Sequence, residues 1–137
     1  MTQELIDMAL ALSPTEKTDL IERLRLSMIG KRPAEDLALL SQRRGETLLE
    51  IAAIALGVGG IGRSGRHTDV FGRSLVAWQM RSEGFSTIEI GDAIGKDHST
   101  ITYLSQKVAD IVRCPDADRA GYTMVRNFMR LVDNADR

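Results

Sequence analysis

The chain has 137 residues, of which 43% are hydrophobic and 4% aromatic, with one cysteine and a formal net charge of −1. This length suits one domain, or one domain with an arm. The lone cysteine excludes an internal disulfide and fits a reducing, cytoplasmic setting. We expect no membrane helix or secretory signal, because no apolar run is long enough and the N-terminus lacks a basic start.

Helical spacing of apolar residues dominates the N-terminal part. It predicts a helix over 5–12 and another that opens at Ser13–Glu16, where serine, proline and glutamate suit a capped first turn. The second helix carries an apolar stripe over 20–28 and ends at Gly30. Pro33 is expected to begin a further helix.

Glycines divide the middle of the chain. Gly45 predicts a break before a helix over 48–56, and the glycine-rich segment 57–66 predicts a basic loop. A helix is expected from about Asp69 to Ser82. The sequence GVGGIG at 57–62 matches a dinucleotide-binding fingerprint, but we reject the match because a helical pattern precedes it where a strand is required. The same absence of a strand argues against a phosphate-binding P-loop.

The remaining elements are also predicted to be helical. Ser86–Glu89 forms a capping box that opens a short helix, Gly95–Lys96 forms a turn, and a longer helix runs from His98 to Arg113. The buried stripe of that longer helix is expected at Ile101, Leu104, Val108, Ile111 and Val112. Pro115 ends it, and a last helix over 122–132 is expected to pack through Tyr122, Val125, Met129 and Val132.

We divide the chain into an N-terminal helical arm at 1–43, a DNA-binding module at 44–113 and a C-terminal helical tail at 114–137. Net charge alone does not favour nucleic acid, since the isoelectric point is near 6.1. Any cationic face would come from a local cluster, whose members are Arg43, Arg44, Arg63, Arg66 and Arg73. Scattered arginines of this kind are more often a solvated surface.

The sequence offers no catalytic, cofactor or metal constellation. His67 and His98 are the only histidines and have no cluster of cysteine or acidic ligands near them in the sequence. Cys114 is a lone thiol beside a proline, which is more often a packing residue than a nucleophile. We therefore expect a protein that is not an enzyme.

The helix predicted at His98 opens with polar residues. Placing its apolar stripe inward leaves Ser99 and Thr102 on the outer face. Asp97 suits a cytosine amino group, His98 and Ser99 suit purine edges, and a Thr100 or Thr102 methyl suits thymine. The first-turn amides suit a phosphate, as do Ser86 and Thr87 at the preceding helix start. The plainer alternative is that Asp97 is an N-cap followed by ordinary first-turn residues.

The segment 90–101, IGDAIGKDHSTI, resembles the signature of domain IV, the C-terminal DNA-binding domain of the bacterial replication initiator DnaA. That signature runs roughly IG-x-A-F-G-(G)-R-D-H-[ST]-T-V, and the resemblance covers about residues 45–113. The chain departs from it by one missing turn glycine and by Ile94 in place of phenylalanine.

This resemblance implies an all-α helical bundle with a helix-turn-helix, of the DnaA domain IV or Trp-repressor-like kind. It also implies that Asp97, His98 and Ser99 read bases in the major groove, with Thr100 near the phosphates. A basic loop, here Arg63 to Arg66, would reach a minor groove or the backbone. Lys96 and Lys107 would lie near phosphate.

The resemblance covers only the DNA-binding part of an initiator. We expect no ATPase module and no nucleotide binding, and we predict a cytoplasmic, nucleoid-associated protein that binds double-stranded DNA and regulates replication initiation or transcription. The 1–43 arm is expected to pack on the module, or to serve a homodimer or protein partner. The alternative function is an antitoxin-like adaptor that uses the N-terminal helices and binds DNA weakly.

Overall fold

The computed structural model describes residues 18 and 33–136, and every element within 33–136 is helical. The elements are α3 (Pro33–Leu56), α4 (His67–Ser82), α5 (Thr87–Ile94), α6 (His98–Arg113), the short 3-10 helix η1 (Pro115–Ala117) and α7 (Arg119–Ala135). The predicted all-α class is confirmed for this part of the chain. The expected helix at 5–12, the cap at Ser13 and the stripe at 20–28 lie outside the described residues.

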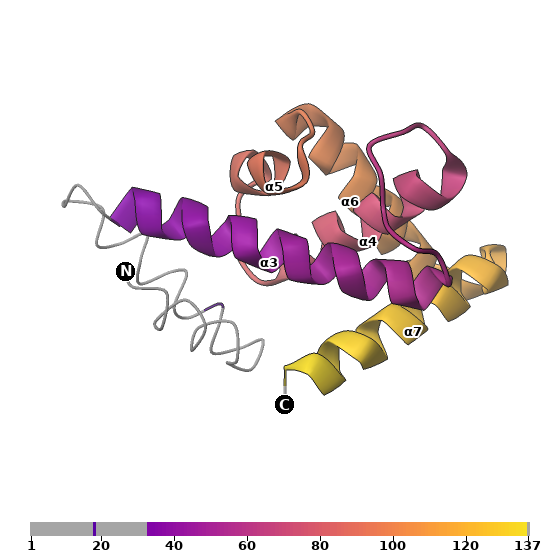
Figure 1. Cartoon of the computed structure of the whole chain (residues 1–137). Coiled ribbons are helices and arrows are strands. Elements are labelled where there is room, and N and C mark those ends of the chain that lie inside the picture. The colour runs from indigo at the N-terminus through magenta and orange to yellow at the C-terminus, as the bar shows by residue number, and fades with distance from the viewer. Residues whose placement is uncertain (1–17, 19–32, 137) are drawn as a thin grey trace.

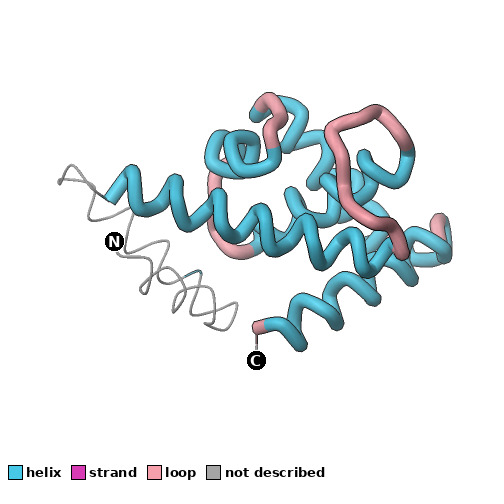
Figure 2. The backbone as a smooth tube through the Cα atoms, in the orientation of Figure 1, coloured by secondary structure: helices cyan, strands magenta, loops and turns pink. Residues whose placement is uncertain are grey.

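The long helix α3 crosses the molecule, with α5 and the start of α6 on one side and α7 on the other (Figure 1). Helices α4 and α6 share the most extensive packing, and α3 packs against α4, α5 and α7. Within residues 33–136, the loops are the glycine-rich segment and the short turns between and after the later helices (Figure 2). None of the described helices combines the length and the apolar character needed to cross a membrane.

The predicted break at Gly45 is wrong, because α3 continues through it. Gly45 is buried, and a Cβ atom built on it would lie 2.9 Å from the Cβ of Ala93 in α5. The glycine therefore allows two helices to approach closely. This close approach outweighs the cost of about 1 kcal/mol that glycine brings to a helix interior.

The predicted helix ends around α5 are confirmed. Ser86 is the N-cap of α5 and forms the capping box with Glu89 in both directions. Gly84 and Gly95 have positive φ angles of 100° and 72°, which glycine adopts without a steric penalty. Helix α6 has the predicted bounds, while α4 begins two residues before the predicted Asp69, at His67.

The core of the described part is built from apolar side chains of α3, α4, α5, α6 and α7, together with Phe85 of the α4–α5 connection. The predicted stripe of α6 is buried except for Val112, which is 37% exposed. The predicted register of α7 is wrong at Met129, which is 41% exposed, because Phe128 takes the buried position. Helix α7 thus completes the core beside α3.

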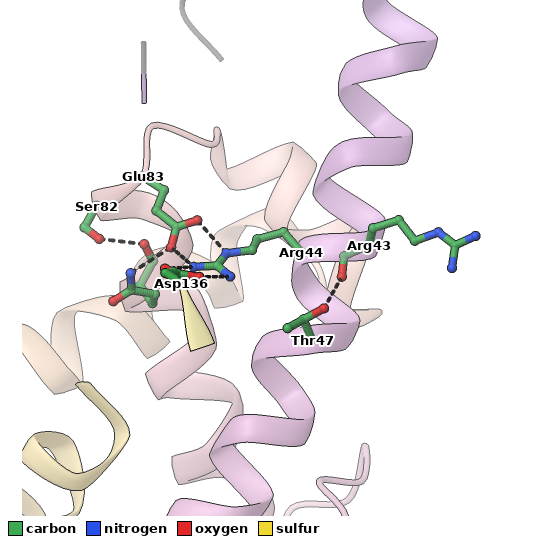
Figure 3. Close-up of polar contacts among 7 residues, drawn as sticks. Arg43, Arg44, Thr47, Ser82, Glu83 and Asp136 are labelled. Atoms are coloured by element: carbon green, nitrogen blue, oxygen red, sulfur yellow. Dashed lines mark hydrogen bonds and ion pairs between the residues drawn. The ribbon is translucent and has the colours of Figure 1, made fainter. Parts of the chain in front are cut away.

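Arg44 does not belong to a cationic face, contrary to the sequence-based grouping. Its guanidinium is buried and donates to both carboxylate oxygens of Glu83 at 2.8 Å and to Asp136 at 3.0 and 3.2 Å. Figure 3 shows this cluster, with Arg43 pointing away from it on the same helix. The cluster ties α3 to the end of α4 and to the end of α7.

Candidate nucleic-acid interface

The turn between α5 and α6 is tight and depends on two glycines. Gly95 ends α5 in the left-handed conformation, and the Lys96 amide donates to the carbonyl of Gly91 at 2.9 Å. A Cβ atom on Gly91 would lie 2.5 Å from the Lys96 carbonyl oxygen, so only glycine allows this approach. The turn fixes where Asp97 and His98 begin the next helix.

The polar residues that open α6 are exposed and linked to each other. The side chains of Asp97 and His98 are 68% and 65% exposed, and His98 Nδ1 lies 3.2 Å from Asp97 Oδ1. The Ser99 hydroxyl donates to the other Asp97 carboxylate oxygen at 3.0 Å. This cluster, Asp97–His98–Ser99, presents a carboxylate, an imidazole and a hydroxyl together at one helix end.

The plainer alternative, that Asp97 is an N-cap, agrees with its position but not with its side chain. Asp97 occupies the N-cap position, but its side chain makes no capping hydrogen bond, and its backbone carbonyl accepts from the amides of Thr100 and Ile101. The amides of His98 and Ser99 have no acceptor among residues 33–136. Two amide donors and the helix dipole therefore remain available to an anion.

The glycine-rich loop is held in shape by Asp69 of α4. One Asp69 oxygen accepts from the Gly62 amide at 3.0 Å, and the other accepts from the Ser64 hydroxyl. These hydrogen bonds, with smaller contributions from nearby Arg73 and Arg66, lower the pKa of Asp69 below its ordinary value. The acidic residue of this basic region therefore shapes the loop.

Arg73, on α4, holds the same loop through its backbone and is not part of a cationic face. It is only 4% exposed, and its guanidinium donates to the carbonyls of Gly62 and Ser64, the latter at 2.8 Å. Its Nε atom is buried without a hydrogen-bond partner, and burial lowers the pKa of this guanidinium. Ile61 completes the anchor by packing on Gly72, where a Cβ atom would lie 2.5 Å from it.

The loop and the α5–α6 turn meet. The Lys96 ammonium donates to the Arg63 carbonyl at 3.1 Å, and a Cβ atom on Gly95 would lie 2.9 Å from the Arg63 guanidinium. Arg63 is exposed and Lys96 is half-buried. The structure therefore brings a basic residue that is 33 positions away in sequence to the turn that precedes Asp97.

The other predicted site residues lie in several environments. Arg66 is exposed at the N-cap of α4, and Thr102 is exposed on α6. Thr100, Lys107 and Thr87 are half-buried. Ser86 is half-buried too, and its hydroxyl is occupied as the acceptor of the α5 capping box.

Two groups at this site were missed at the sequence level. Asp69 and Arg73 hold the loop, and neither was among the predicted DNA-contacting residues. Their spacing of four residues places both on one face of α4, but nothing in the sequence shows that this face meets Gly62 and Ser64.

A helix, α3, precedes the glycine segment where a dinucleotide fold would have a strand. Within the described part of the chain, no three histidine, cysteine, aspartate or glutamate side chains form a group suited to a metal ion. No family model, no curated protein and no solved structure matches this chain.

Proposed function

We propose that this protein binds double-stranded DNA with sequence preference, through α5, the turn and α6 acting as a helix-turn-helix. The observation that carries the proposal is the exposed Asp97–His98–Ser99 cluster at the start of α6. In this arrangement α6 enters the major groove with its N-terminal end against base edges. Aspartate, histidine and serine offer the acceptors and donors that such edges require.

The neighbouring cations support the same orientation. Arg63 and Lys96 flank the start of α6, and Arg66 is exposed at the far end of the same loop. Arginine and lysine at the border of a groove neutralise phosphates and fix the register of the protein on the duplex. The shaped loop would place Arg63 and Arg66 on the backbone or in the adjacent minor groove.

Loss of base contacts is the direct test. A preferred site is first selected from a random DNA pool, and affinities for this site and for a scrambled duplex are then measured by band shift. His98→Ala with Ser99→Ala should relax specificity, at a cost of about 1–3 kcal/mol for each lost base contact. Equal affinities of wild type and double variant for the selected site would contradict the proposal.

Loss of a phosphate contact has a different signature. Arg66→Gln should weaken binding to selected and scrambled duplexes alike, and it should reduce the slope of log affinity against log salt by about 0.9. Arg113→Gln is the matched control, because Arg113 is exposed, pairs with Asp110 at 3.0 Å and lies at the opposite end of α6 from His98. The control should retain the wild-type slope.

We place this activity in the regulation of replication initiation or transcription at the nucleoid, without catalysis and without nucleotide binding. A selection that enriches no DNA sequence would favour the adaptor alternative, in which residues 1–43 serve a protein partner. A duplex-binding protein whose selected sites form paired half-sites would favour a homodimer.

A further inference from the structure

Helix α7 carries a polar, cationic stripe that the proposed DNA interface does not use. Its members share one face of the helix through spacings of three and four residues, and they are Arg119, Tyr122, Thr123, Arg126, Asn127 and Arg130. We refer to these residues as the α7 stripe. No acidic residue occurs between Arg119 and Val132, although the whole chain has a net charge of −1.

The α7 stripe points away from the core. Val125, Phe128 and Val132 are the large buried residues of α7. At 3.6 residues per turn the stripe lies on the opposite side of the helix, and all its members are exposed or half-buried. In Figure 1, α7 and the α5–α6 turn lie at opposite edges of the molecule, with α3 between them. The two cationic surfaces therefore belong to opposite edges of the fold.

The α7 stripe carries three arginines, and one exposed carboxylate, Asp133, borders its C-terminal end beside Arg126 and Arg130. Arg126 has no ion pair among residues 33–136. Arg130 donates to Asn127 at 2.9 Å, and Arg119 lies 3.7 Å from Asp116 in a pair that is almost fully exposed. A groove of about 370 Å³ is lined by Tyr122, Thr123, Arg126, Asn127 and Arg130.

This set of side chains matches one class of ligand. Arginine, asparagine, threonine and tyrosine are among the side chains that contact phosphate oxygens of nucleic acids. A bilayer surface would require large apolar groups among the cations. The exposed Met124 and Met129 lie to either side of the α7 stripe, and the ring of Tyr122 is the one large apolar group within it. The phosphate backbone of a duplex is thus the better match to both the charge and the polarity of this face.

We propose that the α7 stripe is a second, sequence-independent binding surface for the phosphate backbone of duplex DNA. One molecule then contacts two duplex segments, one through α6 and one through α7. The bridging of two segments rests on the function proposed above, whereas phosphate binding by the stripe does not.

Binding stoichiometry tests the two surfaces separately. The full-length protein is titrated with a short fluorescent duplex that contains the selected site, at low salt. Wild type should bind two duplexes per molecule, Arg126→Gln with Arg130→Gln should bind one, and Arg113→Gln should again bind two. If wild type and the α7 variant both bind one, this inference is wrong. If wild type binds one and the α7 variant binds none, the stripe is confirmed and the helix-turn-helix proposal fails.

Bridging is tested by energy transfer between two separately labelled duplexes. Wild type and Arg113→Gln should give transfer, and the α7 variant should lose it while retaining its affinity for the selected site. Unchanged transfer in the α7 variant would overturn the proposal. The proposal would also fail if wild type were a dimer that the α7 variant dissociates. It would fail too if the α7 variant lost flotation with phosphatidylglycerol vesicles but kept the wild-type duplex stoichiometry.

Discussion

The buried charge cluster at Arg44 gives the sharpest prediction about stability. Arg44→Met keeps the length and packing of the side chain but removes its charge and donors. The carboxylates of Glu83 and Asp136 then face each other in the interior, with side chains only 1% and 4% exposed. We expect a large loss of folding free energy without a change of fold.

The magnitude follows from the composition of the cluster. One guanidinium donates to two buried carboxylates, so its removal takes the same cation from both. Burial alone would lower the pKa of Arg44, but hydrogen bonds and charge attraction from Glu83 and Asp136 raise it above its ordinary value. Removing one partner of such a buried pair costs about 3–5 kcal/mol. This is a large share of the stability of an ordinary domain, about 5–15 kcal/mol.

Asp136→Asn should cost less, because it keeps an amide oxygen that can accept from Arg44 and leaves the bidentate pair of Arg44 with Glu83 intact. Its expected cost is that of weakened hydrogen bonds to a charged group, about 1–3 kcal/mol. The variants are compared by urea unfolding followed by circular dichroism, with constant m-values as the check that the transition is the same. Glu50→Gln, at an exposed position of the same helix, is the control and should stay within about 0.5 kcal/mol of wild type. A loss in Arg44→Met no larger than that in Asp136→Asn would refute this account.

Two further predictions concern the candidate interface. Gly91→Ala places a methyl 2.5 Å from the Lys96 carbonyl, so it should lower stability by about 1–3 kcal/mol and weaken DNA binding. Gly60→Ala, where the methyl meets nothing within 4 Å, should leave stability and DNA binding unchanged. Equal urea unfolding midpoints for wild type and Gly91→Ala would contradict the turn geometry. Asp69→Asn should increase hydrogen exchange at the Gly62 amide and reduce DNA affinity at neutral pH. The folded pKa of Asp69 lies below the ordinary 3.8. The stabilisation of the loop by ionised Asp69 should therefore be fully present above about pH 4 and be lost only as the pH falls through that lower pKa. If the Gly62 amide lost its protection from exchange already near pH 6, another group would hold the loop.

Local signals in the sequence predicted the helix ends well. The capping box at Ser86 and the turn glycine at Gly95 act through neighbours within a few residues, so their effect is readable without the fold. Gly45 was misread because its role is a contact with Ala93, which is 48 residues away and on another helix. The register of α7 failed for a related reason: Phe128 and Met129 are both apolar, and the packing of α7 on α3 and α6 decides which one is buried.

The charged residues show the same limit more clearly. Five arginines between residues 43 and 73 look alike in the sequence, yet Arg44 and Arg73 are buried whereas Arg63 and Arg66 are exposed. The partners of Arg44 are 39 and 92 residues away, and those of Arg73 are backbone carbonyls of the loop. Sequence charge counts therefore include cations that no ligand can reach.

This separation also explains how a chain of net charge −1 can present cationic surfaces. The buried arginines neutralise buried carboxylates or shape a loop, whereas Arg63 and Arg66 are exposed in the loop beside the start of α6, and Arg119, Arg126 and Arg130 lie along α7. A phosphate backbone responds to the local potential within roughly a Debye length, about 8–10 Å at ordinary ionic strength. Over that distance Arg63 with Lys96, or Arg126 with Arg130, matter more than the sum over the whole chain.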